Sequence, residues 1–148
     1  MPTTLYDLAQ RSAGIEEVPG PVHHPLIQFG FTLCGGYGLE TPDEVPWCSA
    51  WLQIWPWLLE LPRSKSAAAR SWLLVGREIP LAQAHPGYDV VILDAPGRGE
   101  KAGHVGFYAG EIPGRVTLFG GNQSDRVRWT SFPTDRVIGV RRLYEEQV

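Results

Sequence analysis

The sequence predicts an α+β fold in which N-terminal helices pack on a C-terminal antiparallel sheet of about five strands. Up to about Gly76 the apolar residues recur with helical spacing. From Asp89 onward, short β-branched and aromatic runs alternate with turn residues. Helices first and strands afterward are typical of the α+β class. The 148 residues provide for one such core, so we expect a single domain spanning residues 1–148.

Two short helices are expected near the N-terminus. Thr3 or Thr4 can cap the first, which ends near Gly14, because a threonine oxygen accepts from free N–H groups at a helix start. His24-Pro25 opens the second, since the fixed φ angle of proline suits the first helical turn. Each helix carries apolar residues that predict packing against the core.

Two further helices complete the first half. The third begins near Trp47-Cys48 and contains Pro56, where we expect a kink or an early end because proline lacks an N–H donor. Ser64 or Ser66 caps the fourth, Ala67–Val75, and the following glycine stops it.

The second half reads as strands joined by short turns. The linkers at 96–99 and 111–114 contain proline and glycine, and they suit the tight connections of an antiparallel meander. The expected strands are Asp89–Ala95, His104–Gly110, Arg115–Gly120, Arg126–Phe132 and Val137–Tyr144.

Charge and composition exclude several classes of protein. A net charge of −3 argues against a nucleic-acid partner. Two cysteines are too few for a disulfide scaffold or a four-cysteine zinc site. The apolar stretch 50–62 is interrupted by polar residues and falls short of the roughly 20 residues of a membrane span. The N-terminus lacks the features of a signal peptide, so we expect synthesis in the cytoplasm and no integral membrane segment.

Cys48 is the first residue whose position suggests chemistry. It lies where a loop closed by Pro46 meets the start of the third helix. Free backbone N–H groups and the helix dipole favour negative charge there, which lowers the pKa of a thiol. The backbone amides of Cys48 and Ser49 can also donate to an oxyanion. Cys48 is thus a candidate nucleophile, and the alternative is a buried cysteine that only packs.

His104 opens a predicted strand and has a glycine immediately before it. Small neighbours allow another element to approach closely, so the imidazole can reach a thiolate as general base. The alternative is a surface histidine. The other histidines, His23, His24 and His85, lie in proline-containing loops and are weaker candidates.

Asn122 follows the strand that comes directly after the His104 strand and lies 18 residues after His104, a spacing that lets the chain return beside the imidazole. Its carbonyl oxygen can accept from the ring N–H and fix the tautomer. Gln123 and Asp125 are alternatives, because adjacent strand residues point to opposite faces. The same segment also has the composition of a simple hairpin turn.

These segments resemble the papain-like cell-wall cysteine hydrolases of the CHAP and NlpC-type superfamily, most of all a small single-domain branch from phage and bacterial genomes. The matching segments are DEVPWCSAW at 43–51, ARSWL at 69–73, GHVGFY at 103–108 and GGNQ at 120–123. The resemblance implies Cys48 as nucleophile, His104 as base and Asn122 as orienter. It implies hydrolysis of an amide bond in peptidoglycan without a metal or cofactor.

The resemblance also implies a substrate groove beside the nucleophile. Glu44 and Trp47 precede Cys48 and are expected to line it, with Ser49 and Gln123 as further oxyanion or substrate-binding candidates. Two features depart from the family pattern, namely Tyr88 between Gly87 and Asp89 and the Trp55-Pro56 interruption of the helix. Cys34 has no assigned role; it is either a small buried residue or an oxidation partner of Cys48.

Two rival functions remain open. One is a non-catalytic wall-binding or interaction module with exposed Trp47 and Trp129 as sugar-stacking platforms, while Trp51, Trp55 and Trp72 pack in the core. The other is a zinc hydrolase that uses His23 or His24 with Cys48 and His104. The enzyme is expected to act on the cell wall or periplasm, as a phage lysis enzyme with a holin-type partner or as an antibacterial toxin with an immunity partner.

Overall fold

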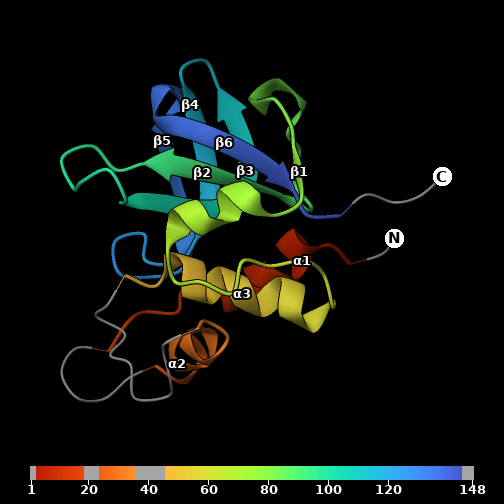
Figure 1. Cartoon of the computed structure of the whole chain (residues 1–148), viewed down its shortest axis with the longest axis vertical. Coiled ribbons are helices and arrows are strands. Elements are labelled where there is room, and N and C mark those ends of the chain that lie inside the picture. The colour runs from red at the N-terminus through yellow and green to blue at the C-terminus, as the bar shows by residue number, and fades with distance from the viewer. Residues whose placement is uncertain (1–2, 19–23, 36–45, 145–148) are drawn as a thin grey trace.

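The N-terminal helices lie on one side of an antiparallel sheet, as Figure 1 shows. The computed structural model describes residues 3–18, 24–35 and 46–144. Its α-helices are α1 (Leu5–Ala9), α2 (Pro25–Thr32) and α3 (Cys48–Leu58). The predicted α+β arrangement is confirmed. No helix in these ranges has the length and hydropathy needed to cross a bilayer.

The sheet has six strands in the order β1-β6-β2-β3-β4-β5. From β2 to β5 the strands form the expected meander, whereas β6 crosses back to pair with β2. The extra strand is β1, whose two residues carry no periodic pattern and which pairs with β6. The strands are β1 (Arg77–Glu78), β2 (Asp89–Asp94), β3 (Gly103–Ile112), β4 (Arg115–Gly120), β5 (Arg128–Pro133) and β6 (Val137–Arg142).

Helix α3 lies between α2 and the sheet (Figure 1). Every residue from Cys48 to Pro56 is buried, as expected of a helix that is covered on all sides. Gly30 allows α2 to approach this closely, because a Cβ there would collide with the backbone carbonyl of Ala50. Trp51 packs edge-on against Phe107 and Phe119 of the sheet. The N-terminus of α3 is therefore held rigidly against the strands.

Helix starts and ends follow local chemistry closely. Thr4 caps α1 in a capping box with Asp7, and His24 caps α2 through its side chain. Helix α3 ends two residues after Pro56, in line with the early end that proline predicts.

The predicted fourth helix, Ala67–Val75, also needs correction. Residues Ala69–Leu74 form a 3₁₀ helix, η2, and the residue at its N-cap, Ala68, makes no side-chain cap. Tertiary contacts override helix propensity here, because the Ser66 carbonyl accepts from the buried Ser49 hydroxyl at 2.6 Å. The indole of Trp72 also donates to Ser49, at 2.8 Å, which fixes η2 against α3.

The strand register brings the end of β2 and the starts of β3 and β6 together on one side of the sheet, where these strands begin or end. Leu93 near the end of β2 pairs with His104 at the start of β3, and on its other side with Val137 at the start of β6. Asp94 pairs with Gly103 in the same way. This side of the sheet therefore carries His104, the β2–β3 loop and the residues just before β6.

Candidate active site

Cys48 is the first residue of α3 and lines a groove despite being only 5% exposed. Its thiol forms a hydrogen bond with the His104 side chain and accepts hydrogen bonds from the backbone N–H groups of Ser49 and Val105. Burial alone opposes ionisation of the thiol. The charge and hydrogen bond of His104, helped by the two N–H groups, outweigh that effect and lower the pKa of Cys48.

His104 is held on its other side by Gln123, whose Oε1 lies 2.9 Å from the imidazole Nε2. The Gln123 amide nitrogen donates to the backbone carbonyls of Leu118 at 3.2 Å and Arg128 at 2.6 Å. These two bonds orient the amide so that its oxygen faces the ring. Nε2 therefore carries a proton, and Nδ1 is left as the nitrogen that serves the Cys48 thiol.

The electrostatics favour a thiolate–imidazolium pair. Burial would lower the pKa of His104, but the negative charge on Cys48 and the hydrogen bonds to Cys48 and Gln123 raise it. The pKa of the thiol moves down and that of the imidazole moves up, so both shifts stabilise the ion pair relative to the neutral thiol and imidazole. Such a pair is the reactive state of a cysteine nucleophile.

The two cysteines provide an internal comparison of reactivity. Burial raises the pKa of Cys34 to about 11, with Arg63 opposing the effect, and its thiol donates to the Gly30 carbonyl at 3.5 Å. We expect iodoacetamide at pH 7 to label Cys48 well before Cys34, because the thiolate is the reacting species. Peptide mapping by mass spectrometry measures both sites in one sample. Equal labelling of the two cysteines would contradict the shifted pKa of Cys48.

The hydrogen bond that the sequence assigned to Asn122 is made by Gln123. Asn122 has a φ of 55° and lines the groove, and Asp125 has a φ of 61° and accepts from the Glu17 N–H through its backbone carbonyl. Strand β4 ends at Gly120, so the alternation of strand side chains does not apply to the residues after it. A Cβ on Gly120 would lie 2.8 Å from Gln123 Oε1, so this glycine makes room for the amide.

Two of the residues expected to line the groove around Cys48, Trp47 and Ser49, are buried instead. Trp47 is completely buried and donates from Nε1 to Glu17 at 3.0 Å, so the prediction that it is exposed is wrong. It lies against Gly121, where a Cβ would come within 2.7 Å of the indole. Ser49 is buried too, and only its backbone N–H faces the thiol. Glu44 lies outside the described residues.

Gln53 is a structural support that the sequence did not single out. It is completely buried on α3, and its amide donates to Ser64 Oγ at 2.9 Å and the Ser66 carbonyl at 3.0 Å. Its carbonyl accepts from the Lys65 backbone at 3.1 Å. Gln53 thus fixes the segment that leads into η2, and residues 67–69, where this segment meets η2, line the groove. A glutamine in the middle of a mostly apolar helix was the signal for this role.

The groove has a volume of about 820 Å³ and carries Cys48, His104 and Gln123 in its lining. Its cationic lining residues are Arg98, Lys101 and Arg136. Across residues 3–18, 24–35 and 46–144, no group of three or more His, Cys, Asp or Glu side chains could hold a metal ion. Of the histidines in the zinc alternative, His24 bonds the Leu26 N–H at 3.1 Å, and His23 lies outside the described residues.

Comparison with known proteins relates the fold to solved structures. No protein-family model and no curated protein sequence matches the chain. The structure is similar to that of NlpC1 from Trichomonas vaginalis, with a TM-score of 0.57 and 19% sequence identity. The match covers 96% of this chain and 44% of that chain, so the sequence spans less than half the length of that protein. At this identity the likeness establishes the fold alone: the chain has the NlpC-like, papain-like α+β fold that the sequence predicts.

Proposed function

We propose that the protein is a cysteine hydrolase that cleaves an amide bond of peptidoglycan. One observation carries the proposal: the Cys48 thiol hydrogen-bonds with His104, and Gln123 holds the far side of the imidazole, at the edge of an open groove. A nucleophile, a base and an orienting group in that order are the parts that acyl transfer requires. In this proposal Gln123 orients the imidazole of His104, the role that the sequence analysis assigned to Asn122.

The reaction proceeds through a thioester. The Cys48 thiolate attacks the amide carbonyl carbon, and backbone N–H groups at the start of α3 stabilise the oxyanion. His104 gives its Nδ1 proton to the leaving nitrogen as the C–N bond breaks. The neutral imidazole then takes a proton from water, whose oxygen attacks the thioester carbonyl. The C–S bond breaks, and the acid product leaves behind the thiolate–imidazolium pair.

The cell wall as substrate is supported by the four sequence segments that resemble wall hydrolases and by the NlpC-like fold. Membership of the CHAP group or of a phage branch remains a prediction from sequence. So do the two settings, a phage lysis enzyme with a holin-type partner or an antibacterial toxin with an immunity partner. Either setting requires delivery to the peptidoglycan.

Digestion of purified sacculi tests the proposal. We expect the wild-type protein to release muropeptides, and mass spectrometry of the products identifies the bond cleaved. Pre-treatment with iodoacetamide abolishes the release, whereas a chelator leaves it unchanged, because the thiolate does the chemistry. Loss of activity with chelator instead would support a zinc hydrolase. Sedimentation of intact protein with sacculi and no product release would support a wall-binding module.

A further inference from the structure

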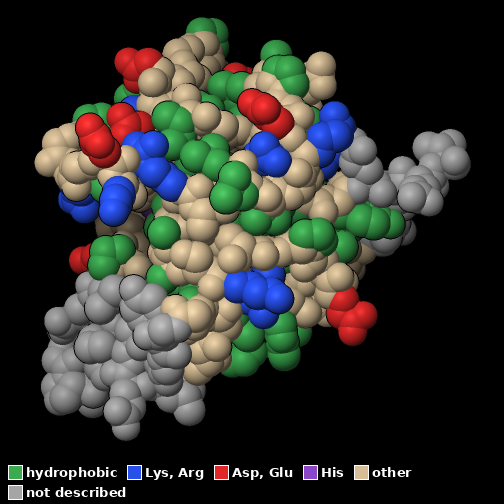
Figure 2. All heavy atoms as spheres, in the orientation of Figure 1, with side chains coloured by type: hydrophobic (Ala, Val, Ile, Leu, Met, Phe, Trp, Pro, Cys, Tyr) green, Lys and Arg blue, Asp and Glu red, His purple; other side chains and the backbone are tan. Residues whose placement is uncertain are grey.

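Cationic side chains collect in the groove beside the catalytic pair, although the chain as a whole has a net charge of −3. Figure 2 shows Lys and Arg side chains, with acidic ones beside them, at the edge of the face where the β2–β3 loop lies in Figure 1. Three cationic residues, Arg98, Lys101 and Arg136, line the groove. None of the described residues in its lining is Asp or Glu. The groove is therefore more positive than the molecule that carries it.

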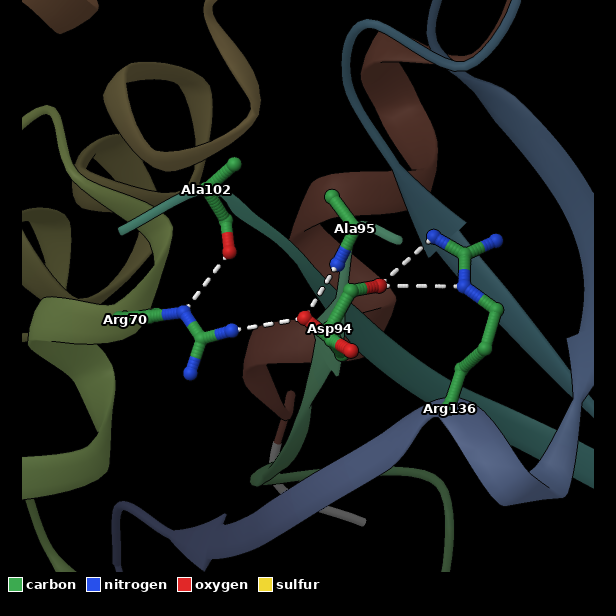
Figure 3. Close-up of polar contacts among 5 residues, drawn as sticks. All are labelled: Arg70, Asp94, Ala95, Ala102 and Arg136. Carbon is green, nitrogen blue, oxygen red and sulfur yellow. Dashed lines mark hydrogen bonds and ion pairs between the residues drawn. The ribbon is translucent and has the colours of Figure 1, made fainter. Parts of the chain in front are cut away.

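Arg136 is the cation whose position is fixed. It lies just before β6, where its Nε and Nη2 donate to the backbone carbonyl of Asp94 at 3.0 and 2.8 Å (Figure 3). Its guanidinium lies over the Phe132 ring, 5.2 Å from the centroid. The Phe132 ring is in turn 5.4 Å from the His104 ring. Arg136 is thus held in place on the His104 side of the groove.

The nearby carboxylate does not neutralise Arg136. Asp94 Oδ1 pairs with Arg70 Nη2 at 2.7 Å and accepts from the Ala95 N–H at 2.9 Å. Arg70 also donates to the Ala102 carbonyl at 2.7 Å, which ties both ends of the β2–β3 loop together. In Figure 3 the two guanidiniums approach Asp94 from opposite sides, Arg70 at the carboxylate and Arg136 at the carbonyl. Within the described part of the chain, Arg136 has no carboxylate partner and its Nη1 makes no hydrogen bond.

We propose that Arg136, assisted by Arg98 and Lys101, forms a subsite for a substrate carboxylate near the scissile amide. A guanidinium held by two bonds and an aromatic face has lost its side-chain freedom before the substrate arrives, so little entropy is lost on binding. The N–H groups of Arg136 that make no bond within the protein can donate to a ligand, and they bind a carboxylate more strongly than a neutral acceptor. The subsite rests on the proposed hydrolysis of peptidoglycan, whose stem peptides carry free carboxylates.

Binding to a matched pair of peptides tests the subsite without requiring turnover. The probes are a synthetic peptidoglycan stem peptide with free carboxylates and the same peptide with carboxamides in their place. Calorimetry uses the Cys48→Ala protein, so that neither probe is consumed. We expect the carboxylate peptide to bind about tenfold more tightly or better. Arg136→Gln removes this preference and leaves the affinity for the carboxamide peptide unchanged.

Arg115 provides the control, because its Nε and Nη2 also donate to a single residue, Ser131, at 2.8 and 3.0 Å. It lies at the start of β4, outside the groove lining. Arg115→Gln removes the same charge and retains the full preference, and Arg136→Lys retains part of it. Should Arg136→Gln fail to fold, the double variant Arg98→Gln, Lys101→Gln must weaken carboxylate binding at low salt.

The outcomes separate the two proposals. Equal affinities for the two peptides, or an Arg115→Gln effect as large as that of Arg136→Gln, overturns the subsite even if the wild-type enzyme digests sacculi. A carboxylate preference that depends on Arg136, in a wild-type protein that hydrolyses neither peptide nor sacculi, supports the subsite and overturns the proposed reaction.

Discussion

Replacing Cys48 by alanine is expected to reduce muropeptide release from sacculi by at least about 10³-fold, because no other group in the described groove can form the thioester. Cys48→Ser is expected to be equally inactive. A serine hydroxyl has no thiolate form at neutral pH, and His104 is arranged here to stabilise a thiolate rather than to deprotonate an alcohol. Initial rates of product formation, measured by chromatography of the digests, give the loss.

The fold should survive these substitutions. Cys48 is small and lies at the groove wall, so removal of its sulfur costs about 1 kcal/mol of unfolding free energy. Cys34→Ala is the matched control, since Cys34 is a cysteine of similar burial that does not line the groove. It should keep wild-type activity and cost a similar amount of stability in a thermal melt. Full activity of Cys48→Ala would remove the nucleophile from the proposal.

The nucleophile and the base were accessible to sequence reasoning because each depends on local structure. Cys48 follows a proline-closed loop and begins an apolar helix, and His104 begins a strand after a glycine. The structure puts them at these positions, one at the start of α3 and the other at the start of β3. Local patterns of helix capping and strand composition are the part of folding that a single sequence records best.

The rest of the groove depends on contacts between distant segments. Strand β6 crosses back to β2, and this pairing brings Arg136 to the carbonyl of Asp94, 42 positions away in the chain. No periodicity in the sequence indicates that β6 pairs with β2. The burial of Trp47 likewise depends on Gly121, which leaves space for the indole only once β4 lies against α3. Sheet order and side-chain packing therefore had to come from the structure.

The choice between Gln123 and Asn122 can be settled by a matched pair of alanine variants. Gln123→Ala is expected to lower kcat about a hundredfold, because the imidazole loses the 2.9 Å bond that fixes its orientation and tautomer. Asn122→Ala removes the neighbouring amide, which makes no bond to His104 in the described structure, and should change kcat by less than about threefold.

The pH profile distinguishes orientation from a general loss of structure. Gln123 accepts from the imidazole and so favours its charged form, which raises the pKa of His104. Without that bond the pKa falls, and the thiolate–imidazolium pair is lost at a lower pH on the alkaline side. The alkaline limb of kcat/KM should therefore move to lower pH in Gln123→Ala and stay in place in Asn122→Ala. If Asn122→Ala instead lost activity and shifted this limb, the orienting role would belong to Asn122 and not to Gln123.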